Sequence, residues 1–177
     1  MNLFMNKSLM LLVGLLIISR LIGLPTNFSP MLAVAIFMPR LTSRKSIQSF
    51  LPAGVMLLTS IFLPPVDLLI LSCIIFIFLI TPIVSRRINN LVYSCISNVL
   101  LWFFVVNGAV WISGGGSLIE IYIAAIPFDF RLLLSTSLYL LLFNSLEKFV
   151  KAHSQHCLLY TSPSPRDAHE SRMPSSA

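Results

Sequence analysis

Few side chains in this sequence are of the types that carry out chemistry, and they form no recognisable catalytic motif. Of the three histidines, His153 and His156 follow the last apolar segment and His169 lies in a polar tail. The glycines at 114–116 precede no Lys-Ser or Lys-Thr pair, so they do not make a phosphate-binding loop. An HExxH zinc motif and a serine nucleophile elbow are also missing from the sequence. We therefore expect a protein that is not an enzyme and has no cofactor.

The cysteines indicate neither a metal site nor a disulfide framework. Cys73, Cys95 and Cys157 are odd in number and lack the spacing of metal ligands. Cys73 and Cys95 lie in apolar segments, where a free cysteine acts as a small hydrophobic residue.

The polar residues that remain become informative only when the chain is placed in a membrane. Of 177 residues, 56% are hydrophobic and 10% are charged, and the mean hydropathy is +0.91. Soluble domains carry about 25% charged residues, so this chain could not cover its surface in water. The net charge of +6 would favour nucleic-acid binding in a soluble protein. Here the basic residues flank apolar runs as topology determinants, so the expected partner is the lipid bilayer and not nucleic acid.

The apolar runs predict an all-α integral membrane bundle of about six transmembrane helices. The run at 30–38 is too short to cross a hydrocarbon layer of about 30 Å, and we expect a short or broken helix buried among its neighbours. Residues 118–126 are also too short, and they suit an interfacial or re-entrant segment. The predicted spans are 8–24, 30–38, 50–63, 66–84, 91–112 and 132–149, and together they form one domain over residues 1–153.

Basic loops predict the orientation of this bundle. Arg40, Arg44 and Lys45 follow the second span, and Arg86-Arg87 follow the fourth, so both loops should be cytoplasmic. Both termini then lie in the cytoplasm. The first apolar run has no small-x-small cleavage site after it, so we expect it to be retained as a helix. Residues 20–29, 64–67 and 113–130 fall at the outer side.

The last residues differ abruptly in composition from the rest of the chain. Residues 154–177 are rich in proline and serine and have no apolar period, which is typical of a disordered tail. The string LLYTSPSPRDAHESRMPSSA at 158–177 resembles the translated read-through of a sequencing adapter. We therefore expect residues 158–177 not to contribute to the fold.

Polar and aromatic side chains gather at the predicted outer side and suggest a small-molecule pocket that opens outward. Arg20 would suit an anionic ligand. The alternative is ordinary interface chemistry, with Arg20 as an interfacial anchor, aromatic belt residues, and an ion pair between Asp129 and Arg131. The candidate ligand-binding residues are Arg20, Asn27, Asn107, Trp111 and Tyr122.

Three stretches resemble, in order and spacing, the signatures of an uncharacterised family of small bacterial multi-pass membrane proteins. They are LPTNFSPMLAVAIF, WFFVVNGAVWISG and YIAAIPFDFRLLLSTSLYLLLF. Ser135-Thr136 stands where a Gly-Asp pair is often found in that family. The positions that match are Asn27, Phe28, Pro30, Asn107, Val110, Trp111, Pro127 and Phe128.

That family is similar, in size and six-span layout, to the S components of energy-coupling-factor vitamin transporters. The resemblance implies an S-component-like bundle in the bacterial inner membrane that captures a small solute at its outer face. It also implies a transmembrane coupling subunit with ATPases as a partner. The rival hypothesis is a structural or assembly membrane protein with no small-molecule site, in which the same polar residues hold helices together.

Overall fold

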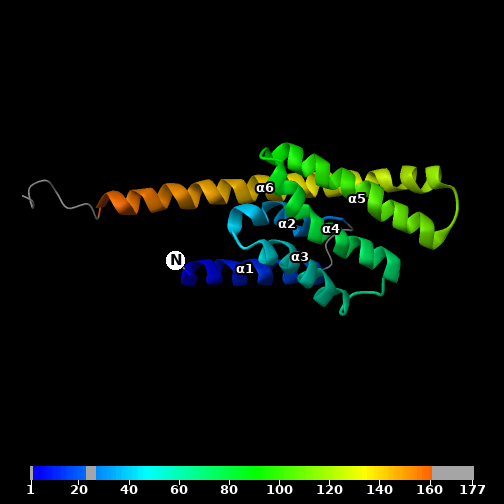
Figure 1. Cartoon of the computed structure of the whole chain (residues 1–177), viewed down its shortest axis with the longest axis horizontal. Coiled ribbons are helices and arrows are strands. Elements are labelled where there is room, and N and C mark those ends of the chain that lie inside the picture. Colours follow the sequence, from blue (N-terminus) through cyan, green and yellow to red (C-terminus); the bar gives the residue numbers. More distant parts are fainter. Residues whose placement is uncertain (1, 23–26, 161–177) are drawn as a thin grey trace, which may run out of the picture. The chain divides into compact units, whose positions relative to one another are not determined.

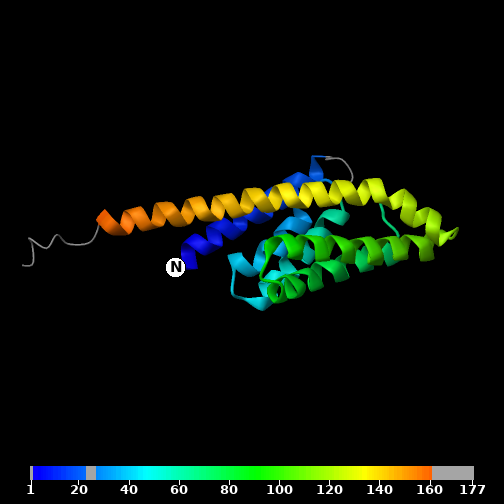
Figure 2. The ribbon, with the colours of Figure 1, turned by 90° about the horizontal axis from the view of Figure 1, so that it is seen from above.

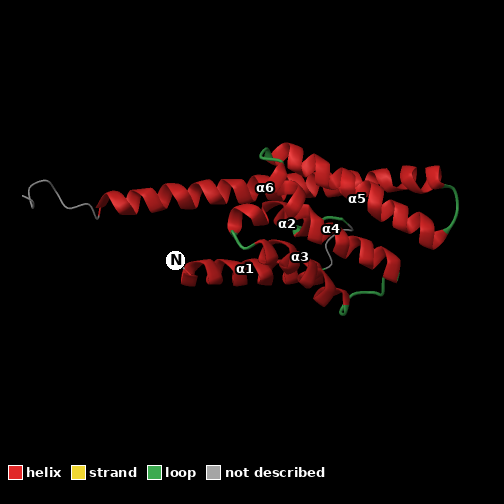
Figure 3. Cartoon of the chain, in the orientation of Figure 1, coloured by secondary structure: helices red, strands yellow, loops and turns green. Residues whose placement is uncertain are grey.

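The computed structural model describes residues 2–22 and 27–160, with side chains for 12–22 and 27–151. This part consists of α-helices joined by loops and turns (Figures 1 and 3). Residues 23–26, which include the predicted end of the first span at Leu24, and residues 161–177 of the predicted tail lie outside it. The helices are α1 (Asn2–Leu21), α2 (Met31–Leu41), α3 (Lys45–Ser60), α4 (Leu68–Arg87), α5 (Leu91–Gly114) and α6 (Leu118–Tyr160).

Helix α2 forms the core of the bundle. Every residue from Met31 to Met38 is buried, and the helix contacts α3, α4 and α5. A helix that is apolar on all sides has no face for water and is stable only when other helices surround it. This agrees with the prediction of a short helix buried among its neighbours. The helix continues through Pro39 and Arg40 to Leu41, so the loop before α3 is shorter than predicted.

Helices α4 and α5 are long, apolar and antiparallel. In the described part of the chain, they are the two helices long and apolar enough to cross a membrane, with mean hydropathies of 2.8 and 1.8. Asp67 caps α4 by accepting a hydrogen bond from the backbone N–H of Leu69 at 2.8 Å. Asn90 caps α5 in the same way through Val92 and Tyr93. Two helices that could cross a membrane do not by themselves establish the six predicted spans.

Helix α6 corrects the prediction of a separate segment at 118–126. The chain is one continuous helix from Leu118 to Tyr160, with Pro127 inside it. A proline removes one backbone hydrogen bond, but neighbouring turns and packing can preserve the helix around it. Figure 2 shows α6 bending near its start, and proline is an established cause of such bends.

The chain divides within α6 into two compact units. The first, Met1–Leu141, holds α1 to α5 and the first part of α6, and the second begins at Leu142. In the second unit, Lys151 forms an ion pair with Glu147 one helical turn away. The helix reaches Tyr160, beyond the predicted end of the last span at Phe149 and into the stretch predicted as tail.

Candidate functional site

The centre of the candidate site is a buried pair formed by Asn107 on α5 and Asp129 on α6. Asn107 Nδ2 donates a hydrogen bond to Asp129 Oδ2 at 2.7 Å and a second to the carbonyl of Phe103 at 2.8 Å. The two residues are only 9% and 7% exposed. Asp129 is therefore a carboxyl group held by an amide inside the bundle. A group of this kind is costly to bury and usually has a structural or functional partner.

The Asp129–Arg131 ion pair, which the interface alternative included, is not formed among the described residues. Positions i and i+2 on a helix point in different directions, so the two side chains do not face each other. The Arg131 guanidinium lies instead over the ring of Phe128, 5.7 Å from its centroid. Asp129 is thus available to α5 and not to its near neighbour in sequence.

Tyr122 lies close to this pair and joins the same two helices. Its hydroxyl donates to the carbonyl oxygen of Phe104 at 2.9 Å, and its ring meets the ring of Phe103 edge-on, with centroids 5.2 Å apart. A Cβ atom added at Gly108 would lie 3.4 Å from the Tyr122 hydroxyl. The tyrosine hydroxyl therefore reaches the backbone of α5 at Gly108, at a distance that leaves room for a β-carbon but not for a larger side chain.

Trp111 lies at the end of α5, next to the turn into α6. Its indole Nε1 donates to the carbonyl oxygen of Gly116 at 3.2 Å, and the side chain is 39% exposed. Gly115 and Gly116 have φ angles of 66° and 104°, which favour glycine. At the same end, Ser113 donates to Asp67 at 3.1 Å and ties α5 to the start of α4.

Asn27 lies in the loop that leads into α2 and has a positive φ of 63°. Asparagine is one of the few residues other than glycine that adopts this conformation readily. The residues after it contact α6: the ring of Phe28 lies 6.2 Å from that of Tyr139, and Ser135 donates to the carbonyl of Ser29 at 3.2 Å. The asparagine thus shapes a loop that packs on α6.

Arg20 lies in the last turn of α1 and contacts α3. Its Nε donates to Thr59 Oγ1 at 3.2 Å, and Thr59 itself is buried. The Thr59 hydroxyl itself donates a hydrogen bond to the backbone carbonyl oxygen of Val55 at 2.8 Å. This contact joins the C-terminal ends of α1 and α3.

The five predicted residues therefore divide into two groups. Asn107, Trp111 and Tyr122 belong to the α5–α6 hairpin, whereas Arg20 and Asn27 lie on other elements. Among the described residues no hydrogen bond joins Arg20 or Asn27 to the first group. Asp129 was not among the candidate residues, although a carboxyl group next to apolar segments is a signal that could have found it.

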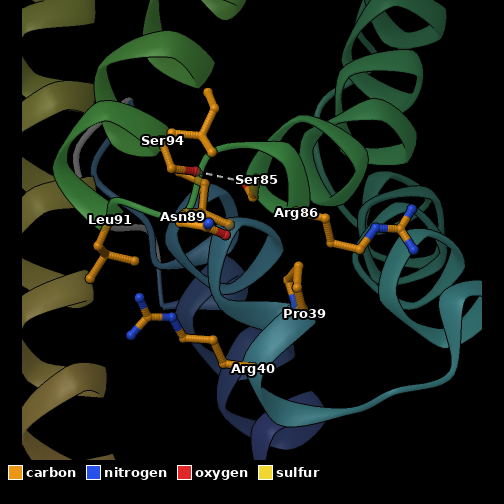
Figure 4. Close-up of a pocket in the computed structure, with 9 residues that line it drawn as sticks. Pro39, Arg40, Ser85, Arg86, Asn89, Leu91 and Ser94 are labelled. Carbon is orange, nitrogen blue, oxygen red and sulfur yellow. Dashed lines mark hydrogen bonds between the residues drawn. The ribbon is translucent and has the colours of Figure 1, made fainter.

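A second group of polar residues lies at the other end of α5, at the turn from α4. Ser94 donates to Ser85 at 2.8 Å, and Asn98 Nδ2 donates to Ser85 at 3.2 Å. Ser94 and Asn98 lie one helical turn apart on α5, so they share a face and both contact Ser85 on α4. Beside this network is a pocket of about 250 Å³ between α2 and the α4–α5 turn (Figure 4). The pocket predicted from the sequence was at the opposite, outer end of the bundle.

A comparison with known protein families shows which family the chain is related to. A family model described as a family of unknown function, DUF6580, matches residues 3–158. The chain belongs to the DUF6580 family. This agrees with the resemblance to an uncharacterised family, and the match includes all five candidate residues and Asp129. No curated protein and no solved structure shows a significant match to this DUF6580 member.

Proposed function

We propose that this DUF6580 protein is an integral membrane protein of the S-component type that captures a small polar solute at the α5–α6 end of its bundle. The observation that carries the proposal is the buried Asn107–Asp129 pair, with its 2.7 Å hydrogen bond. An ionisable group inside an apolar helical bundle is costly, and in membrane proteins such groups commonly mark ligand or ion sites. Tyr122 and Trp111 provide aromatic walls on the same hairpin.

The surface of α5 supports a location in lipid. Large apolar side chains are exposed at every fourth position along one face of the helix, in a row that water would not favour. Lipid tails would cover such a row, because they need no hydrogen bonds from it. These residues are Val92, Ile96, Leu100 and Phe104.

The distribution of charge supports the proposed orientation. Arg40 and Arg86 line one pocket at the α4–α5 end, so the two most basic loops lie at the same end of the bundle. The positive-inside rule assigns that end to the cytoplasm. The α5–α6 end then faces outward, where a solute would enter, and both termini are cytoplasmic in the proposed six-span topology of the inner membrane.

The proposed protein does no chemistry of its own on the solute. Asn107 and Asp129 would provide hydrogen-bond donors and acceptors for a polar solute, and Arg20 would attract an anionic one. Energy for release into the cell would come from a transmembrane coupling subunit with its ATPases. Coupling partners of this kind follow from the resemblance to S components and form part of the proposal.

The test is ligand-dependent thermal stabilisation of the full chain, purified in detergent and screened against vitamins and their precursors. A solute at about 100 times its Kd should stabilise the fold by about 2.7 kcal/mol. Asp129→Asn keeps an amide next to Asn107 but removes the charge, so it should abolish the ligand shift and leave the unliganded fold nearly unchanged. A full screen without any shift, on well-folded protein, would overturn the proposal.

A second candidate function is structural, as an assembly protein without a small-molecule site. One observation favours it: the side-chain donors of Asn107, Trp111 and Tyr122 all bind carbonyl or carboxyl groups of the chain itself. The variants Asn107→Ala and Trp111→Ala distinguish the solute-binding function from the structural one. Loss of folding without any change in solute uptake would favour the structural role.

A further inference from the structure

The α5–α6 hairpin, which carries the proposed solute site, holds negative charge and no positive charge over a long stretch. Residues 88–130 contain Glu120 and Asp129 but no lysine, arginine or histidine. Arg131 is the next basic residue in the chain; it is exposed, and its guanidinium lies over the ring of Phe128. The fixed charge of the hairpin around the site therefore favours a cation over an anion.

The carboxyl group of Asp129 has acceptor capacity that the protein leaves unused. Its Oδ2 accepts one hydrogen bond, from Asn107 Nδ2 at 2.7 Å. No described residue donates to its Oδ1, and the group forms no ion pair in that part of the chain. Unlike Asn98 Oδ1, this oxygen is not sealed from solvent. A carboxylate can accept about four hydrogen bonds, and a buried one without a cationic partner is costly, so a bound cation would remove part of this cost.

Three aromatic rings form a cluster beside the Asn107–Asp129 pair. The ring centroids of Phe103 and Tyr122 are 5.2 Å apart, and the ring of Phe104 lies 5.4 Å from the first and 6.3 Å from the second. The carbonyl of Phe103 accepts the second hydrogen bond of Asn107, so the rings begin one helical turn from the pair. The face of an aromatic ring attracts a cation, and ammonium groups are recognised by several such rings together. A carboxylate beside aromatic rings is therefore suited to an organic ammonium.

We propose that the solute captured at the α5–α6 end is a small organic cation, an ammonium compound with an apolar part, and not an anion. Asp129 neutralises the charge of the solute, and the rings of Phe103 and Tyr122 pack against its carbon groups. Arg20 has no part in this site, because its Nε donates to Thr59 on α3 and no described hydrogen bond joins it to the hairpin. The inference rests on the proposed function and names the substrate class of the same site.

The experiment uses the full chain in a maltoside detergent and records the thermal unfolding midpoint with matched probes. Choline is compared with dimethylbutanol, its uncharged carbon analogue, and benzylammonium is compared with benzyl alcohol and with benzoate. An upward shift with either cation that its uncharged or anionic counterpart does not give supports the proposal. An equal shift with the counterparts, or no shift with either cation, overturns it.

Failure of the cationic class can be distinguished from failure of solute capture. If a neutral or anionic compound in the wider screen gives a shift that depends on Asp129, the proposed function stands and only the cationic class is overturned. If no compound of any charge stabilises the well-folded protein, both proposals are overturned.

Two carboxyl groups of the hairpin provide a variant and its matched control. Asp129→Asn keeps the size of the side chain and removes its charge, so it should lose most of the cation-dependent shift. Glu120→Gln removes a charge at an exposed position of the same helix and should keep the shift. An equal loss in the two variants would indicate general charge attraction and would overturn the proposal.

Variants of Tyr122 test the aromatic part of the site, and they provide the test even if Asp129→Asn does not fold. Tyr122→Phe keeps the ring and should keep most of the cation-dependent shift, whereas Tyr122→Leu should lose a large part of it. Equal shifts in the two variants would overturn the proposal that aromatic rings hold the cation.

Discussion

Asn107 Nδ2 lies 2.7 Å from Asp129 Oδ2, across 22 residues of sequence and between two different helices. The contact fastens α5 to α6 one helical turn before Trp111, and the carboxyl group that it holds is only 7% exposed. Because the contact is buried, the loss of either partner leaves the other group without a hydrogen bond, since no water can take the place of the lost partner.

Asn107→Leu should destabilise the fold, since it leaves the buried Asp129 without its donor. The expected loss is about 1–3 kcal/mol of unfolding free energy. Asp129→Asn should cost less, because its amide can still pair with that of Asn107. The double variant Asn107→Leu with Asp129→Leu should recover part of the loss. Denaturant titration in mixed micelles, followed by circular dichroism, gives the free energy of unfolding of all three variants. If the loss in the double variant equals the sum of the two single losses, the two residues are not coupled.

The conformation of Asn27 predicts a difference between two small substitutions at that position. Its φ of 63° suits glycine but strains an ordinary L-residue. Asn27→Gly should change stability by only a few tenths of a kcal/mol, whereas Asn27→Ala should cost about 1–2 kcal/mol. Thermal unfolding of the two variants provides the comparison. If Asn27→Gly also loses a ligand shift found for the wild type, the amide contacts the ligand.

Thr81 and Thr59 are both buried threonines, but their hydroxyls differ in partners. Thr81 Oγ1 has no hydrogen-bond partner among the described residues, whereas Thr59 Oγ1 accepts from Arg20 and donates to Val55. Thr81→Val should therefore stabilise the fold by about 1 kcal/mol, because it removes a buried and unsatisfied hydroxyl. Thr59→Val should destabilise it by a similar amount. The midpoint of thermal unfolding should move in opposite directions for the two variants.

Gly108 is the place where Tyr122 approaches the backbone of α5. A methyl group there would lie 3.4 Å from the tyrosine hydroxyl, which is ordinary contact. Gly108→Ala should therefore be tolerated and can gain up to about 1 kcal/mol from its higher helix propensity. Gly108→Leu should displace Tyr122 and lose its hydrogen bond to Phe104, so the fold should weaken. Tyr122→Phe should then cause little further loss of stability when Gly108 is already leucine. If the two losses of stability add in full, this geometry is refuted.

The sequence by itself determined the features that depend on hydropathy and local chemistry. The helical class, the N-terminus of α4 at Asp67 and the pairing face of Ser94 and Asn98 all follow from apolar runs, caps and helical spacing. The same local signals indicated that the short apolar run at 30–38 is buried, because it has no polar face and is bounded by prolines. The family resemblance likewise depended on motifs that are contiguous in the chain.

Tertiary structure alone decided which polar groups meet. The interface alternative paired Asp129 with Arg131, its neighbour in sequence. Helical geometry separates positions i and i+2, and the hairpin brings Asn107 to Asp129 instead. Residues 118–126 were expected to form a separate interfacial or re-entrant segment, but α6 continues from them through Pro127 as one helix. The pocket lined by Arg40 and Asn89 brings together the last turn of α2 and the α4–α5 turn, two positions that are 49 residues apart in the sequence. Such contacts arise from antiparallel packing around α2, and no local pattern encodes them.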